Sequence, residues 1–209
     1  MIEPGKFAVF VGAAWALIIA PGPDMLYVIS RGMAQGRRAG VVSAGGVIGG
    51  VLVHTTAAAL GLTLIFQTSA LAFLVVRCLG AAYLICLGLQ AWRDQGAFKL
   101  QAPTASASAR SLFWQGVLSN VLNPKVTVFF LAFLPQFVND GNGPITQQLL
   151  ILGLTFALFG LCFLVVVGYF AGVVGAWLTR RPHYAKTLRW LTGGILVGLG
   201  LRLALAEQR

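Results

Sequence analysis

Long runs of hydrophobic residues, separated by short polar segments, make up most of the chain. Each run approaches or exceeds the roughly 20 apolar residues that a helix needs to cross a membrane. The runs are continuous and lack the two-residue alternation of lipid-facing strands, so they predict helices and not a barrel. We expect six spans, at Phe7 to Ser30, Val41 to Phe66, Leu71 to Trp92, Leu112 to Pro135, Gln148 to Leu178 and Leu188 to Leu205.

The first and fifth runs have features of their own. The first ends in Pro21-Gly22-Pro23 and not in a small-residue cleavage site, so it is interpreted as a retained span. The fifth is longer than one straight crossing requires but too short for two. We therefore expect it to tilt, to bend at Gly160 or Gly168, or to protrude from the membrane.

Composition excludes an ordinary soluble protein. Hydrophobic residues make up 58% of the 209 positions and charged residues 10%, whereas soluble domains carry about 25% charged residues. The sequence leaves no room for a sizeable aqueous domain. We expect an all-α integral membrane protein with a single transmembrane domain over residues 1–209.

The net charge of +10 is interpreted as a topology signal and not as a nucleic-acid site. Basic residues follow the first, third and fifth spans, whereas the connections at 67–70 and 139–147 carry no Lys or Arg. The positive-inside rule then places the basic loops in the cytoplasm, against anionic lipid, and both chain termini outside. The basic residues of these loops are Arg31, Arg37, Arg38, Arg93, Lys99, Arg110, Arg180, Arg181, Lys186 and Arg189.

The chain has the pattern of two related halves. The segment from Arg77 to Leu89 matches the segment from Arg189 to Leu201 at the arginine, at four leucines and at one glycine. Three spans per half make the halves antiparallel, and the first span of each contains an interior proline. Paired interrupted helices indicate an inverted-repeat transporter. We expect repeat one at about 5–95, a linker at about 96–110 and repeat two at about 111–207.

The first break is Pro21-Gly22-Pro23-Asp24. Each proline removes a backbone donor and clashes with the preceding turn, so the helix should kink or unwind here. Freed backbone groups at membrane depth need protein or water around them, which favours an internal cavity. Asp24 is a candidate transport residue, because a carboxylate inside a span is costly. The alternative is that Asp24 only caps the restarted helix.

The second break contains Asn120, Asn123, Pro124 and Lys125. Aligning Pro23 with Pro124 places Lys125 opposite Asp24 in an antiparallel fold. We hypothesise that a zwitterionic amino acid binds between them, with its ammonium on Asp24 and its carboxylate on Lys125 and on free amides of the broken helices. The alternative is that Lys125 extends to a membrane interface.

Two further residues within or near the spans are candidates. His54 has an unperturbed pKa near neutrality, so it is a candidate proton carrier beside Asp24; the alternative is a packed, hydrogen-bonded histidine. Arg77 either reaches an interface or pairs with Asp24. Glycines four apart permit close helix contacts and a possible homodimer.

The sequence has no catalytic motif, cofactor motif or nucleotide-binding loop, so an enzyme is not expected and uphill transport must draw on an ion gradient. Cys78, Cys86 and Cys162 form no CxxC pair and indicate neither a disulfide nor a metal site. Two rival functions remain open: a passive channel for small metabolites, and a membrane thiol-electron conduit that uses these cysteines.

Several motifs resemble the LysE/RhtB family of amino-acid exporters. They are Pro21-Gly22-Pro23-Asp24 with later glycines, Gly46-x-x-Gly49-x-x-x-x-His54, Gly80-Ala-Ala-Tyr83-Leu84, and Leu122-Asn123-Pro124-Lys125 running into Phe133-Leu134-Pro135-Gln136-Phe137. The resemblance extends in order over about residues 5 to 205. It implies a bacterial inner-membrane carrier that exports amino acids such as lysine, arginine, threonine, homoserine or leucine, driven by the proton gradient.

One departure from the family pattern affects the expected substrate. Some relatives place an acid near the position of Gly50, whereas this chain has glycine there. A mechanism that depends on that acid does not transfer, which gives more weight to Asp24 and His54. Without a second buried acid the site offers less to a dibasic side chain, so small or neutral amino acids such as threonine, homoserine or leucine are favoured over lysine and arginine.

Overall fold

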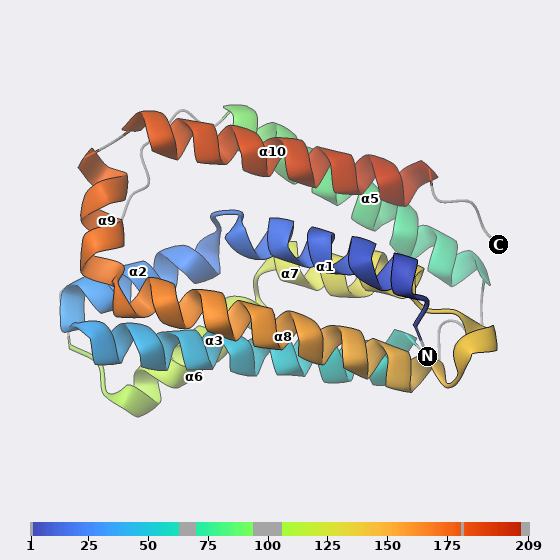
Figure 1. Cartoon of the computed structure of the whole chain (residues 1–209), viewed down its shortest axis with the longest axis horizontal. Helices are drawn as coiled ribbons and strands as arrows, with labels where there is room; N and C mark the ends of the chain where they lie inside the picture. Colours follow the sequence, from blue (N-terminus) through green and yellow to red (C-terminus); the bar gives the residue numbers. More distant parts are fainter. Residues whose placement is uncertain (1, 63–69, 94–105, 181, 206–209) are drawn as a thin grey trace.

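The computed structural model describes residues 2–62, 70–93, 106–180 and 182–205, and all regular secondary structure in these ranges is helical (Figure 1). The first half contains α1 (Pro4–Ile19), α2 (Pro23–Gln35), α3 (Arg37–Ala57) with a π-helical turn (Ala58–Leu62), and α5 (Ala70–Arg93). The second contains α6 (Ala109–Val121), α7 (Pro124–Val128), α8 (Ile145–Tyr169), α9 (Ala171–Arg180) and α10 (Pro182–Leu205). After α7 the chain continues through a π-helical turn (Phe129–Phe133) and two 3₁₀ turns (Leu134–Phe137 and Asp140–Asn142).

Both predicted helix breaks are confirmed. Helix α1 ends at Ile19 and α2 begins at Pro23, with an angle of 47° between them. Helix α6 ends at Val121 and the helical segment from Pro124 to Phe137 leaves it at 51°. In each break a proline occupies the first position of the restarted helix, where its missing N–H is tolerated.

The membrane-spanning character of the helices is confirmed in part. Within the described ranges, two helices are long and apolar enough to cross a membrane, at Arg37–Gly61 and Ile145–Tyr169, and up to four if each bent pair is one span. Helices α5 and α10 cover the predicted third and sixth spans, and Trp190–Leu205 is a shorter apolar helix within α10.

The fifth apolar run divides at Phe170, two residues after Gly168. Helix α8 ends at Tyr169, and α9 begins at Ala171 and turns across the end of the bundle (Figure 1). The overlong run is therefore resolved by a bend, close to one of the two glycines named for it. Helix α10 also begins earlier than expected, at Pro182.

Most of the predicted linker between the halves, at 96–105, lies outside the described residues, as does the end of the predicted second span. The second half starts with α6 at Ala109, one residue after Ser108. The Ser108 side chain accepts a hydrogen bond from the Ser111 backbone N–H at 3.2 Å, which caps the helix.

Glycines set how closely the helices pack. Helix α3 packs against α6 and α8, and α5 packs against α10 (Figure 1). A Cβ atom on Gly46 would collide with the backbone of Phe113 in α6, and one on Gly40 would collide with the backbone of Gly168 in α8. These contacts bring backbones together as small-residue motifs do between membrane helices.

Helices α5 and α10 contact each other through equivalent positions, so that a glycine contact from α5 to α10 has a counterpart from α10 to α5. A Cβ on Gly88 would meet the Gly193 carbonyl oxygen and Val197, and a Cβ on Gly200 would meet the Ala81 carbonyl oxygen and Ile85. The same sequence spacing separates Gly88 from Gly200, Ala81 from Gly193, and Ile85 from Val197. It is also the spacing of the repeat between Arg77 and Arg189.

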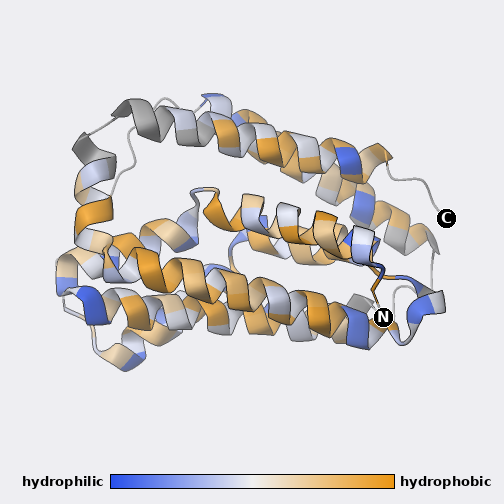
Figure 2. Cartoon of the chain, viewed as in Figure 1, coloured by the Kyte–Doolittle hydropathy of each residue, from blue (hydrophilic) through white to orange (hydrophobic). Residues whose placement is uncertain are grey.

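Most residues along the helices are hydrophobic, and the most hydrophilic residues lie mainly toward the two ends of the bundle (Figure 2). Several large apolar residues are more than half exposed, including Leu60 at 63%, Leu79 at 66% and Val173 at 70%. A surface of this kind is expected in contact with lipid and not with water.

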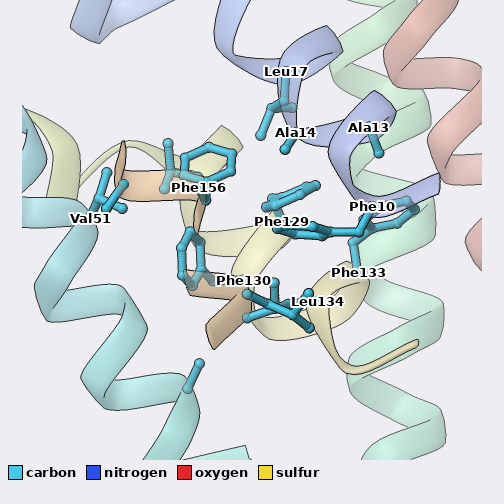
Figure 3. Close-up of a cluster of buried hydrophobic side chains, with 14 of the residues drawn as sticks. Phe10, Ala13, Ala14, Leu17, Val51, Phe129, Phe130, Phe133, Leu134 and Phe156 are labelled. Carbon is cyan, nitrogen blue, oxygen red and sulfur yellow. The ribbon is translucent and has the colours of Figure 1, made fainter. Parts of the chain in front are cut away.

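A cluster of phenylalanines packs between α1 and the segment after α7 (Figure 3). Phe129 is fully buried and its ring contacts those of Phe10, Phe133 and Phe156, with centroids 5.2 to 6.3 Å apart. Rings at these separations add to the energy of apolar burial. The cluster fixes α1 relative to the second half of the chain.

Adjacent glycines in α3 provide a test of the close packing. Gly46→Ala forces its new Cβ into the α6 backbone, whereas a Cβ on Gly45 meets nothing within 4 Å. We expect Gly46→Ala to lower the free energy of unfolding by about 1–3 kcal/mol, the usual cost of overpacking. Gly45→Ala should leave stability unchanged or slightly raised. Thermal unfolding in detergent measures both, and equal stability of the two variants would contradict the packing.

Candidate functional site

Asp24 lies in the first turn of α2, directly after the first break. Its carboxylate accepts hydrogen bonds from Asn120 Nδ2 and Asn123 Nδ2, both at 2.8 Å, and a longer one from Ser119 Oγ at 3.4 Å. The α2 amino-terminus also favours a negative charge here. All three donors come from the second half of the chain, so Asp24 holds the first break against the second.

Lys125 lies in the first turn of α7, directly after the second break. Its ammonium Nζ donates to the carbonyl oxygens of Leu17 at 3.1 Å and Ala20 at 2.9 Å. These carbonyls belong to the last turn of α1 and to its C-cap. Lys125 therefore crosses to the first break, as Asp24 crosses to the second.

Asn123 connects the two interactions. It is the N-cap of α7, where its Oδ1 accepts a hydrogen bond from the Lys125 backbone N–H at 3.1 Å. Its Nδ2 donates to Asp24. One side chain, 2% exposed, thus caps the restarted helix and binds the carboxylate of the other half.

Asn120 is fully buried against α3. A Cβ on Gly50 would lie 2.6 Å from Asn120 Cβ and 2.8 Å from Asn120 Oδ1, so the asparagine occupies the space that a side chain at position 50 needs. Its Nδ2 faces Asp24, while its Oδ1 has no hydrogen-bond partner among the described residues. The glycine at position 50 is therefore required by the way Asn120 reaches Asp24.

A cavity of about 40 Å³ lies between the two breaks. Asp24 and Lys125 both line it, together with Asn120 and the carboxy-terminal end of α1. Much of the remaining lining is apolar and comes from α2, α3, α7 and α8: Met25, Val47, Ile48, Val51, Val126, Phe156, Gly160 and Leu164. The structure thus brings the predicted carboxylate and ammonium into one cavity, with each already hydrogen-bonded to the opposite half.

His54 is on α3, one turn after Gly50, and is 9% exposed. Its Nε2 lies 3.2 Å from the carbonyl oxygen of Asn120, and its ring packs near that of Phe130. Since Asn120 also binds Asp24, one asparagine links the two candidate proton carriers.

The other predicted site residues have different places. Pro21 and Gly22 form the loop of the first break, and Pro23 and Pro124 begin the restarted helices. Arg77 lies in α5. Its pairing with Asp24 stays a prediction.

Sequence reasoning missed Ser119 and the carbonyls of Leu17 and Ala20. Ser119 could have been predicted, because it precedes Asn120 at the end of the helix before the second break. The sequence indicates the Leu17 carbonyl less directly: its helical partner would be the backbone N–H of residue 21, and Pro21 has none.

Removing the charge of Asp24 tests these contacts. Asp24→Asn removes the negative charge that accepts hydrogen bonds from Asn120 and Asn123. A hydrogen bond to a charged group contributes about 1.5–3 kcal/mol to stability. We expect a lower unfolding temperature than for Glu3→Gln, a matched change at an exposed acid. Ser119→Ala should have a smaller effect, since its hydrogen bond is longer. If Asp24→Asn were as stable as Glu3→Gln, the carboxylate would not hold the breaks together.

Comparison with known proteins identifies the family. The LysE type translocator model matches residues 15–207. The chain is 32% identical to the uncharacterized membrane protein YrhP of Bacillus subtilis, over 94% of this chain and 97% of the relative. It is 33% identical to a homoserine/homoserine lactone efflux protein of Salmonella typhimurium, over 92% of each chain.

A leucine efflux protein of Enterobacter sp. is 29% identical over 95% of both chains. No solved structure matches the chain significantly. These names belong to transporters and not to enzymes, and the apolar helices agree with a multi-pass membrane protein. The chain belongs to the LysE type translocator family.

Proposed function

We propose that this protein is a secondary transporter that exports small or neutral amino acids across the bacterial inner membrane. The observation that carries the proposal is the pair Asp24 and Lys125, placed on opposite helix breaks in one cavity. An α-amino acid has the complementary pair of charges. The efflux relatives support the same substrate class.

Both charged groups retain binding capacity. A carboxylate offers about four lone-pair sites, and three donors approach Asp24. An ammonium has three N–H groups, and Lys125 directs hydrogen bonds at two carbonyls. In the proposed complex the substrate ammonium binds Asp24, and the substrate carboxylate binds Lys125 and free backbone amides near the breaks.

The lining of the cavity favours a neutral side chain. The cavity that holds the charged pair is also lined by apolar side chains, among them Val47, Val51, Phe156 and Leu164. Asp24 is the one carboxylate among the lining residues described. A lysine or arginine substrate would carry its second cation into this apolar wall without a partner. Threonine, homoserine and leucine have no such charge.

The cavity must widen to admit a substrate. Its 40 Å³ holds about three water molecules, which is less than any of these amino acids requires. In the proposed cycle the two halves of the chain move about the breaks, and the site opens to one side of the membrane at a time. The matched contacts of Gly88 and Gly200 support halves related as an inverted repeat.

The proposed orientation of the chain in the membrane follows from the charge pattern. Helix α1 begins and α10 ends at one end of the bundle, and the α2–α3 junction with Arg37 lies at the other (Figure 1). Under the positive-inside rule the end with Arg37 faces the cytoplasm.

Export assays test the charged pair. We expect Asp24→Asn and Lys125→Gln to lower uptake of leucine, threonine and homoserine into inverted vesicles roughly ten- to hundredfold, because each removes a charged partner. Glu3→Gln and Lys6→Gln, which change charges near the amino-terminus, are the controls. Wild-type transport by correctly inserted Asp24→Asn and Lys125→Gln variants would refute the site.

The driving force is tested through His54, the proposed proton carrier together with Asp24. We expect His54→Gln to abolish accumulation driven by an imposed pH gradient in proteoliposomes but to retain substrate exchange without a gradient. Loss of both activities would indicate a structural role for His54. Conductance without saturation in the wild-type protein would indicate a channel instead of a carrier.

A further inference from the structure

The carboxy-terminal end of α1 binds a cation. A helix end carries partial negative charge on its unsatisfied carbonyls. The Leu17 carbonyl loses its helical donor because residue 21 is proline, and the helical partner of the Ala20 carbonyl would lie across the break at residue 24. Both carbonyls accept hydrogen bonds from the Lys125 ammonium, at 3.1 and 2.9 Å.

The backbone around this ammonium leaves room for it. Gly22 is extended, with φ −164° and ψ −177°, so any residue could adopt its conformation. A Cβ at this position, however, would lie 3.0 Å from Lys125 Nζ and 3.4 Å from Lys125 Cε. Space beside the ammonium, and not backbone freedom, therefore favours glycine here, because a Cβ would displace Lys125 Nζ from its present position by a few tenths of an ångström.

The arrangement has the form of a monovalent cation site. In transporters with interrupted helices, unwound carbonyls and half-helix carboxy-termini coordinate the coupling ion. Here Asp24 adds a carboxylate to the same cavity. The group on the carbonyls is a compact ammonium, tethered through a flexible stem to the opposite half of the chain.

We propose that the Leu17 and Ala20 carbonyls form a cation site for primary ammonium ions, which this chain fills with its own Lys125. The Lys125 ammonium is held by its own side chain on these carbonyls and so joins the two helix breaks. Without it, the carbonyls would need a cation from solution. Removing its side chain leaves a vacancy that a small primary ammonium ion fills.

Chemical rescue tests this site. Lys125→Ala removes the equivalent of a propylammonium ion, so propylammonium chloride is the probe and tetramethylammonium chloride, which has no N–H donor, is the matched salt. We expect purified Lys125→Ala to unfold about 2–4 °C higher in propylammonium chloride than in tetramethylammonium chloride. The wild-type protein and Lys125→Met, which fills the stem space with an apolar chain, should show no difference between the salts.

Equal unfolding temperatures of Lys125→Ala in the two salts would overturn the proposal. The measured quantity is the unfolding temperature of the protein in detergent. The result therefore does not depend on whether the protein exports amino acids.

A second variant keeps the lysine and serves if Lys125→Ala does not fold. Gly22→Ala crowds the ammonium, and we expect it to lower the unfolding temperature by about 2–4 °C. Gly12→Ala is its control, because a Cβ there meets nothing within 4 Å. If Gly22→Ala proved as stable as Gly12→Ala, the ammonium would not depend on this position and the site would be wrong.

Discussion

The two proline-broken helices of this bundle are joined by side chains that reach from each break to the other. Lipid offers no hydrogen bonds, so the carbonyls freed at the end of α1 need a donor from protein or water. Lys125 provides it from the second break, and Asn120 and Asn123 bind the Asp24 carboxylate of the first. The breaks therefore stabilise each other.

The remaining packing serves this exchange. Gly46 and Gly50 let α3 approach α6 closely enough that Asn120 is buried with its amide toward Asp24. On the other side, the phenylalanine cluster around Phe129 holds α1 against the chain after the second break (Figure 3). The cavity between the breaks combines a charged pair with an apolar wall, as a site for a zwitterion with an uncharged side chain requires.

Much of this arrangement was predictable from sequence. Continuous apolar runs indicated the helices, and proline inside such runs indicated both breaks. Asp24, Asn120, Asn123 and Lys125 stood out because polar groups are scarce in the spans. The partner of Lys125 was not predictable, because backbone carbonyls have no identity in a sequence and a lysine near an aspartate indicates an ion pair. The contact of Asn120 with Gly50 and the bend at Phe170 depend on which helices become neighbours, which local patterns do not specify.

A double-mutant cycle between Asp24 and Asn120 tests the central claim most directly. The unfolding free energies of Asp24→Ala, Asn120→Ala and the double variant give the coupling between the two side chains in the intact protein. Mutual stabilisation of the breaks predicts a coupling of about 1–3 kcal/mol, as expected for a hydrogen bond to a charged group. Additive effects, with a coupling near zero, would contradict it.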